Sequence, residues 1–335
     1  MSHLLPYPPR PLTLRAMILV LVALGALLLL VSAAALSVGS VDVPAASVLD
    51  VITGGGSAST RMIILDIRLP RLLLALLVGA GLSLAGAVFQ ALLRNPLAEP
   101  YILGISSGGT VGAVVAITLG LGLFGVPLLS FTGSAFVMML VYSAARRRGQ
   151  LDTYALLLAG VTIGAFFNAV VLVIIAVFNQ ELRNAFLWLM GNLSGASYAS
   201  LLVVAPVIII AAGILMSRGR AFNLIATGDE TAMQLGVDVR GVKRVSYLLA
   251  SLITGLVVSV SGVVGFVGLI VPHICRLLLG PDHRLLLPAS AVGGASFLVL
   301  ADLLARTVIA PAEIPVGAVT AAIGAPLFIY LLRRS

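Results

Sequence analysis

Charge is scarce in this 335-residue sequence. Only 10% of the residues are Asp, Glu, Lys or Arg, whereas 60% are hydrophobic and the mean hydropathy is +1.18. Soluble domains are usually about one-quarter charged. The composition therefore excludes a water-soluble fold and predicts a polytopic membrane protein.

Cysteine and lysine are nearly absent. The single cysteine, Cys275, cannot form an internal disulfide, and we interpret it as a packing residue; no Cys/His spacing predicts a metal site. The single lysine, Lys243, does not lie in a GxxxxGK[ST] pattern, and no such pattern occurs elsewhere in the sequence. We therefore expect a chain that binds no metal or cofactor of its own, has no P-loop and is not an enzyme.

Long apolar runs are what the sequence has instead. Several reach the roughly 20 residues that cross about 30 Å of hydrocarbon as a helix, so we expect helices rather than barrel strands. The first run follows Arg10 and Arg15 and is long for the apolar region of a signal peptide, so we interpret it as a span. The prediction is an all-α fold with about ten transmembrane helices, at residues 16–36, 72–93, 101–123, 127–145, 153–178, 198–216, 245–265, 268–280, 285–305 and 315–332.

The basic residues indicate the orientation. A net charge of +8 would suggest nucleic acid in a soluble protein, but in a membrane protein Arg and Lys gather in cytoplasmic loops. With residues 1–15 as a cytoplasmic tail, fifteen of the twenty basic residues lie at or near the cytoplasm. We therefore expect a multi-pass inner-membrane protein with both termini cytoplasmic, contacting lipid and no nucleic acid. Five arginines remain outside: Arg61, Arg68, Arg71, Arg183 and Arg306.

Residues 68–104 and 244–280 resemble each other at an offset of 176 positions. Five spans separate the starts of the two copies, so the copies would enter the membrane from opposite sides. An inverted repeat of this kind is typical of transporters, although two Leu-rich helices can also match by chance. The shared residues include four pairs that affect helix geometry: Gly79/Gly255, Gly86/Gly262, Pro96/Pro272 and Gly104/Gly280.

The first candidate functional segment covers residues 94–109, from the cytoplasmic end of one span into the next. Its two prolines and three glycines oppose a regular helix. One interpretation is an irregular entry to a translocation path, where Ser106, Ser107 and Gly108 meet solute or water. The alternative is a tight turn followed by close helix packing through small residues.

The second candidate is the longest polar stretch between spans, a cytoplasmic loop at residues 217–244. Thr227 or Asp229 is placed to cap a short helix, and Gly236 is placed to end it. The apolar residues between them, Ala232, Met233 and Leu235, form its predicted apolar face. An exposed apolar face needs a partner; the alternative is a loop folded back on its own helices. The candidate coupling residues are Gly228, Asp229, Glu230, Thr231, Ala232, Met233, Gln234, Leu235, Gly236 and Val237.

Two further features concern charge within the spans. His273 follows a proline at a predicted helix break, and we favour a structural hydrogen bond over a proton relay. Asp302 and Arg306 are four residues apart, so they can pair on one helix face. Without a P-loop, uphill transport requires either an ion gradient or a separate ATPase. Because this acid has an expected partner, the ion gradient is the weaker interpretation.

Six motifs occur in order along the chain: 68–71 (RLPR), 90–100 (QALLRNPLAEP), 103–108 (LGISSG), 188–191 (WLMG), 265–273 (GFVGLIVPH) and 325–326 (AP). Through them the sequence resembles, over nearly its whole length, the FecCD-type permeases. These are the membrane subunits of ABC importers for ferric siderophores, haem and cobalamin.

The resemblance implies a single permease domain over residues 1–335 with the type II ABC importer architecture. It implies a homodimer, two ABC ATPase subunits that bind ATP and Mg, and a periplasmic or lipid-anchored substrate-binding protein. The 228–237 segment would then couple to the ATPase, and Arg68, Arg71 and Arg306 would face glutamates of the binding protein. A ferric siderophore is the expected cargo, with cobalamin or haem next. An ion-coupled secondary transporter and a passive channel are the alternatives.

Overall fold

The computed structural model describes residues 13–39, 43–147, 150–178 and 182–332. These residues are almost entirely helical, apart from a short hairpin in which β1 (Arg146–Arg147) pairs antiparallel with β2 (Gln150–Leu151). The helices, in chain order, are α1 (Leu14–Ser37), α2 (Ala45–Ile52), α3 (Ala58–Arg61), the π-helix η1 (Met62–Arg68), α4 (Leu69–Leu93), the 3₁₀-helix η2 (Pro100–Leu103), α5 (Ile105–Thr118), α6 (Gly122–Ala145), α7 (Thr153–Val177), α8 (Leu182–Leu189), α9 (Tyr198–Ser217), α10 (Gly219–Thr227), α11 (Asp229–Gln234), α12 (Val239–Ser261), α13 (Val267–Leu279), α14 (His283–Thr307) and α15 (Val316–Leu332).

The all-α prediction and the number of spans are confirmed. Within the described residues, seven helices are long and apolar enough to cross a membrane, and three shorter apolar helices accompany them. The spans predicted at 16–36 and 268–280 correspond to α1 and α13. The 268–280 helix is short because the residues before it, 262–266, are not helical.

Three predicted boundaries are wrong. The span predicted at 101–123 is divided by Gly104, which takes φ +74, a backbone angle that favours glycine. The next helix begins at Gly122 and carries Pro127 inside it, whereas the predicted span begins at Pro127. The span predicted at 245–265 is shifted, because α12 begins at Val239 and ends at Ser261, and α10 and α11 lie between it and α9.

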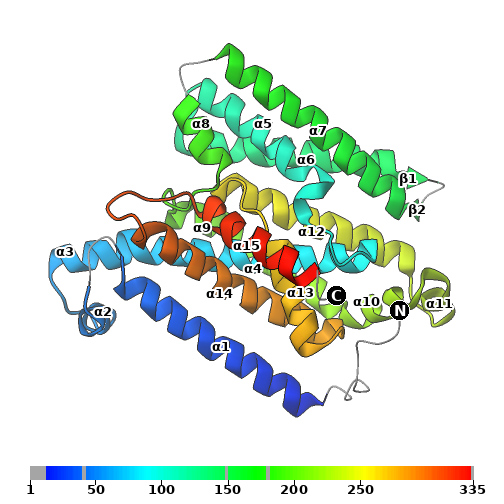
Figure 1. Cartoon of the computed structure of the whole chain (residues 1–335), viewed down its shortest axis with the longest axis horizontal. Coiled ribbons are helices and arrows are strands. Elements are labelled where there is room, and N and C mark those ends of the chain that lie inside the picture. The colour runs from blue at the N-terminus through cyan, green and yellow to red at the C-terminus, as the bar shows by residue number, and fades with distance from the viewer. Residues whose placement is uncertain (1–12, 40–42, 148–149, 179–181, 333–335) are drawn as a thin grey trace.

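Figure 1 shows the long helices stacked side by side, with α4 and α12 in the middle of the stack. α4 contacts α14, α12, α13 and α9, and α12 contacts α6, α9 and α5. The helices α2 and α3 lie at one end of the molecule, and α10, α11 and the β1–β2 hairpin lie at the other (Figure 1). The start of α1 and the end of α15 are both at the α10–α11 end.

The pattern of contacts supports an internal repeat, but with a different register. The series α4, α5, α6, α7 corresponds to α12, α13, α14, α15: α4 packs on α14 as α12 packs on α6, and α5 on α6 as α13 on α14. The first helix of each series ends at Leu93 and at Ser261, an offset of 168 positions rather than 176. The residue pairs of the sequence alignment are therefore not equivalent, since Gly86 lies inside α4 whereas Gly262 caps the end of α12.

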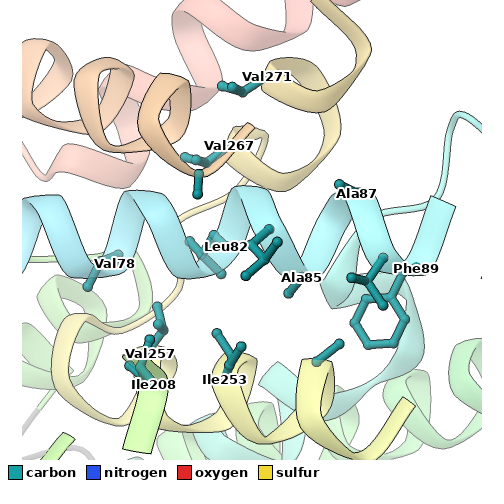
Figure 2. Close-up of a cluster of buried hydrophobic side chains, with 14 of the residues drawn as sticks. Val78, Leu82, Ala85, Ala87, Phe89, Ile208, Ile253, Val257, Val267 and Val271 are labelled. Atoms are coloured by element: carbon teal, nitrogen blue, oxygen red, sulfur yellow. The ribbon is translucent and has the colours of Figure 1, made fainter. Parts of the chain in front are cut away.

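Helix α4 is buried along nearly its whole length. Figure 2 shows its side chains packed against α9 and α12 on one side and against α13 on the other. Small residues permit this approach: a β-carbon added at Gly86 would lie 1.9 Å from the backbone oxygen of Gly268 in α13. The labelled core residues are Val78, Leu82, Ala85, Ala87, Phe89, Ile208, Ile253, Val257, Val267 and Val271.

The contact between Gly86 and Gly268 gives a stability prediction. Gly86→Ala should lower the thermal unfolding midpoint of the purified protein in detergent, because the added methyl meets backbone rather than a movable side chain; overpacking costs about 1–3 kcal/mol. Gly213→Ala in α9 is the matched control, since no atom lies within 4 Å of the added carbon. Equal midpoints for the two variants would contradict the close packing of α4 on α13.

Candidate functional site

At the α10–α11 end of the molecule, a helical hairpin joins α9 to α12. Gly228 makes the reversal between α10 and α11 with φ +134, which few residues other than glycine adopt. Ala232 fixes α11 in place by packing with Ile225 and Val239 in one small apolar cluster. Met233 and Leu235 are 49% and 61% exposed. Of the three residues in the predicted apolar face, two are therefore on the surface and one anchors the helix.

The predicted start of this short helix is wrong and its predicted end is confirmed. Thr227 donates to the carbonyl of Leu224, and Gly228 is the N-terminal cap without a side-chain bond. The side chain of Asp229 does not cap the helix because it is engaged in ion pairs. Gly236 takes φ +84 and ends the helix, where the amide of Gly236 donates to the carbonyl of Met233.

Asp229 joins α11 to two spanning helices. Its Oδ2 lies 2.6 Å from Nζ of Lys243 in α12, and its Oδ1 pairs with Arg94 at the end of α4. Arg94 also donates from Nε to the carbonyl of Ile225 in α10, at 3.1 Å. The two candidate segments, at 94–109 and 217–244, therefore meet at Arg94. Arg94 and Asp229 are both partly exposed, so their pair contributes little stability, about 0–1 kcal/mol, whereas Lys243 is buried. Both pairs fix the position of α11.

A second set of contacts ties α10 to the start of α14. Asn223 donates from Nδ2 to Asp282 Oδ1 at 2.7 Å, and its Oδ1 accepts from the backbone N–H of His283 at 2.8 Å. The hydrogen bonds from Arg284 and Asn223 hold the pKa of Asp282 below its usual range. A movement of α10 would therefore be passed to α14 as well as to α4 and α12.

The three arginines predicted to dock a binding protein lie together at the end of the molecule opposite to α10 and α11. The exposed fractions of Arg68, Arg71 and Arg306 are 6%, 9% and 7%. Arg71 forms ion pairs of 2.9 Å with both Asp302 and Glu313. The predicted pair of Asp302 and Arg306 is present at 3.6 Å, but Arg71 is the closer partner of Asp302.

The other two arginines in this cluster hold the end of α1. Arg68 donates to the carbonyls of Leu36 and Ser37 at 2.6 and 2.9 Å, and Arg306 donates to the carbonyl of Ala35. A positive charge at the C-terminus of a helix is favourable because it faces the negative end of the helix dipole. Docking through these arginines stays a prediction, and a partner's carboxylate would have to compete with these internal groups.

The remaining outer arginines differ from these three. Arg61 is exposed and donates from Nη1 to the carbonyl of Gly54 at 2.8 Å. The side chain of Arg183 lies outside the described residues.

The residues predicted to line a translocation path are closely packed in the chain. Ser106 and Ser107 are 8% and 4% exposed, and Ser107 donates to the carbonyl of Gly104 at 2.7 Å. A β-carbon added at Gly108 would lie 2.4 Å from the carbonyl oxygen of Gly133 in α6. For Gly108 this geometry supports the packing alternative. A role of the three residues in a path stays a prediction.

Sequence reasoning missed a junction between two interrupted helices. After α4 the chain is irregular to residue 99, and after α12 it is irregular at 262–266. Glu99 accepts the backbone N–H of Phe266 at 2.7 Å, and the hydroxyl of Tyr101 accepts that of Val264 at 3.1 Å. Gln90 donates to the carbonyl of Leu269 at 3.2 Å. The sequence feature that could have predicted this junction is the acidic residue Glu99 between Pro96 and Pro100 in an apolar region.

Two single residues can be compared with their predictions. Cys275 is buried in the main apolar cluster, which confirms a packing role. His273 is half-buried, but its Nδ1 has no hydrogen-bond partner among the described residues, so the expected structural bond is not found at that atom. No group of three His, Cys, Asp or Glu in the described part of the chain is arranged to hold a metal ion.

Known proteins resemble this chain over most of its length. The profile of the FecCD transport family matches residues 26–334. The cobalamin import system permease protein BtuC of Halobacterium salinarum is 44% identical over 83% of this chain and 75% of its own length. The hemin transport system permease protein HmuU of Yersinia pestis is 43% identical over 81% and 83%. The iron(3+)-hydroxamate import system permease protein FhuG of Bacillus subtilis is 37% identical over 90% and 92%.

A solved structure resembles the fold as well. It is an inward-facing conformation of a metal-chelate type ABC transporter, and it superposes with a TM-score of 0.84 at 31% identity, over 95% of this chain and 100% of that chain.

The outer cluster gives a stability prediction. Asp302→Asn should destabilise the protein by about 3–5 kcal/mol, because it leaves Arg71 and Arg306 buried with less counter-charge. Glu313→Gln is the matched control: it removes the other carboxylate of Arg71, but its side chain is 41% exposed, so the cost should be about 0–1 kcal/mol. Thermal unfolding in detergent measures both. A loss at Glu313 as large as at Asp302 would show that burial does not set the cost.

Proposed function

The chain belongs to the FecCD transport family, and from this premise we propose that it is the membrane-spanning permease subunit of an ABC importer that brings a metal chelate into the cytoplasm. Three relatives carry names of such permeases, and the superposed structure is a metal-chelate type ABC transporter. The chain itself catalyses no covalent chemistry in this proposal. ATP and Mg bind to the partner ATPase.

The observation that carries the proposal is a pair of exposed apolar side chains at α11: Met233 lies within the helix and Leu235 directly after it. Met233 and Leu235 lie at the α10–α11 end of the molecule, where most of the basic residues predict the cytoplasm. Apolar side chains exposed together outside the hydrocarbon indicate a protein contact. Because Asp229 links α11 to α4 and α12, a force applied to this face would reach two spanning helices directly.

The proposed assembly has two copies of this chain, two ABC ATPase subunits and one substrate-binding protein. It lies in the inner membrane with both termini cytoplasmic. The start of α1 and the end of α15 at the α11 end support this orientation. The outer arginine cluster is the proposed contact for the binding protein. In that contact, glutamates of the partner would replace Asp302 and Glu313 as the partners of Arg71. Arginine suits such a contact because its guanidinium group forms bidentate pairs with carboxylates.

For the cargo we propose a metal chelate of the size and chemistry of cobalamin, haem or a hydroxamate siderophore. The relatives named for cobalamin and haemin are 44% and 43% identical to this chain, and the hydroxamate relative is 37% identical. The relatives named for cobalamin and haemin are thus more similar to this chain than the hydroxamate relative is. The comparison therefore does not favour the ferric siderophore expected from the sequence.

An ion-coupled secondary transporter is the weaker alternative. Such a transporter needs a carboxylate that is free to bind the ion, whereas both oxygens of Asp302 face arginines: Oδ1 faces Arg71 and Oδ2 faces Arg306. The acid at the junction, Glu99, accepts the backbone N–H of Phe266. A passive channel gives no account of the exposed face of α11.

The α11 contact is tested by a charge placed on its apolar face. Leu235→Asp should weaken the affinity of the permease for its ATPase by about 30-fold, which corresponds to about 2 kcal/mol for a central contact residue. Leu235→Met is the matched control because it keeps an apolar side chain, and it should bind like the wild type. Binding is measured with purified permease in nanodiscs. Unchanged affinity for Leu235→Asp would remove α11 as the coupling element.

A further inference from the structure

A cavity of about 910 Å³ opens between α6, α9 and α12. This volume falls within the range of about 300–1,000 Å³ that small-molecule sites occupy. The first part of α6, the first half of α9 and the last part of α12 form its walls, and the segment after α8 closes one end. The candidate path residues of α5 do not line it.

The walls offer almost nothing to a polar molecule. Among the residues that line the cavity there is no charged side chain. The two hydroxyl groups that α12 places on its walls are already used within the chain: Ser259 donates to the carbonyl of Leu256 at 2.7 Å, and Ser261 donates to that of Val257 at 2.9 Å. Because these groups are satisfied, the cavity favours an apolar occupant over a metal chelate with many polar groups.

The mouth of the cavity is lined by exposed apolar side chains. Phe124, Leu128 and Val203 line it and are 71%, 60% and 68% exposed, and they belong to helices that are long and apolar enough to span the membrane. In a bilayer such side chains contact lipid tails, so the cavity is open to the acyl chains around the protein.

One end of the cavity is polar. Asn192 and Ser194 lie there, in the loop between α8 and α9. The Oδ1 of Asn192 accepts the backbone N–H of Ser194 at 2.7 Å, and no partner is recorded for its NH₂ group among the described residues. An amide donor at the end of an apolar cavity matches the ester and phosphate oxygens where a lipid's tail meets its headgroup.

We propose that this cavity binds one acyl chain of a membrane phospholipid, with the headgroup beside Asn192 and Ser194. The bound acyl chain fills space between α6 and α9 and lies against α12. Because α12 carries Lys243, the partner of Asp229, the lipid would contact a helix that is tied to α11. The candidate path residues Ser106, Ser107 and Gly108 do not line this site, and the proposal does not depend on which chelate is carried.

The chain offers its own probe for this site. Trp188 is the single tryptophan of the sequence and lines the cavity. The protein is reconstituted in vesicles of phosphatidylcholine and phosphatidylglycerol whose acyl chains carry bromine, which quenches tryptophan fluorescence on contact. The variants are Val207→Phe, which fills the cavity from α9, and Ile210→Phe, a control on the same helix that does not line the cavity.

We expect strong quenching in the wild type and in Ile210→Phe, and loss of most of it in Val207→Phe. Native mass spectrometry should show one retained phospholipid fewer for Val207→Phe than for the control. Val203→Phe, at a more exposed wall position, should repeat the result if Val207→Phe unfolds, which the thermal midpoint reports. Equal quenching in wild type and filled variants overturns the proposal. Displacement of the brominated lipid by hemin or cobalamin also overturns it, because the cavity would then take cargo.

Discussion

Two interruptions in the helices hold each other, and the rest of the structure is arranged around them. Inside a bilayer, a backbone N–H that leaves a helix has no water to bond to, so another part of the protein must accept it. The break after α12 frees the amides of Val264 and Phe266, and Tyr101 and Glu99 from the other break accept them. The close approach of Gly86 to Gly268 brings the two breaks together. The two repeated series of helices are therefore joined by hydrogen bonds between the breaks that follow their first helices, α4 and α12.

Helix α4 connects this junction to both ends of the molecule. It begins beside Arg71, which pairs with Asp302, passes Gly268 at Gly86 and ends beside Arg94, which pairs with Asp229. A helix buried on nearly all sides cannot move without its neighbours. In the proposed importer, a displacement of α11 by the ATPase would therefore reach the junction and the outer arginines through one rigid element.

The sequence predicted what depends on local pattern. Apolar runs gave about ten spans, Gly236 gave the end of α11, and the spacing of Asp302 and Arg306 gave their pair. It did not predict what depends on contacts between distant segments. Arg71 is the closer partner of Asp302 but lies 231 positions away, and Arg68 and Arg306 bind carbonyls at the end of α1. These distant contacts keep the predicted docking arginines buried. Asp229 is predicted to cap a helix, but its carboxylate pairs with Arg94 and Lys243 instead. The spacing of residues near Asp229 does not predict these two partners.

Uptake by purified components tests the central claim most directly. The permease is reconstituted in proteoliposomes alone and with its ATPase and substrate-binding protein, and entry of hemin, cobalamin and a ferric hydroxamate is measured with and without ATP. The account predicts accumulation of one of these chelates only when all components and ATP are present. Accumulation by the permease alone, whether driven by an ion gradient or without any driving force, would contradict it.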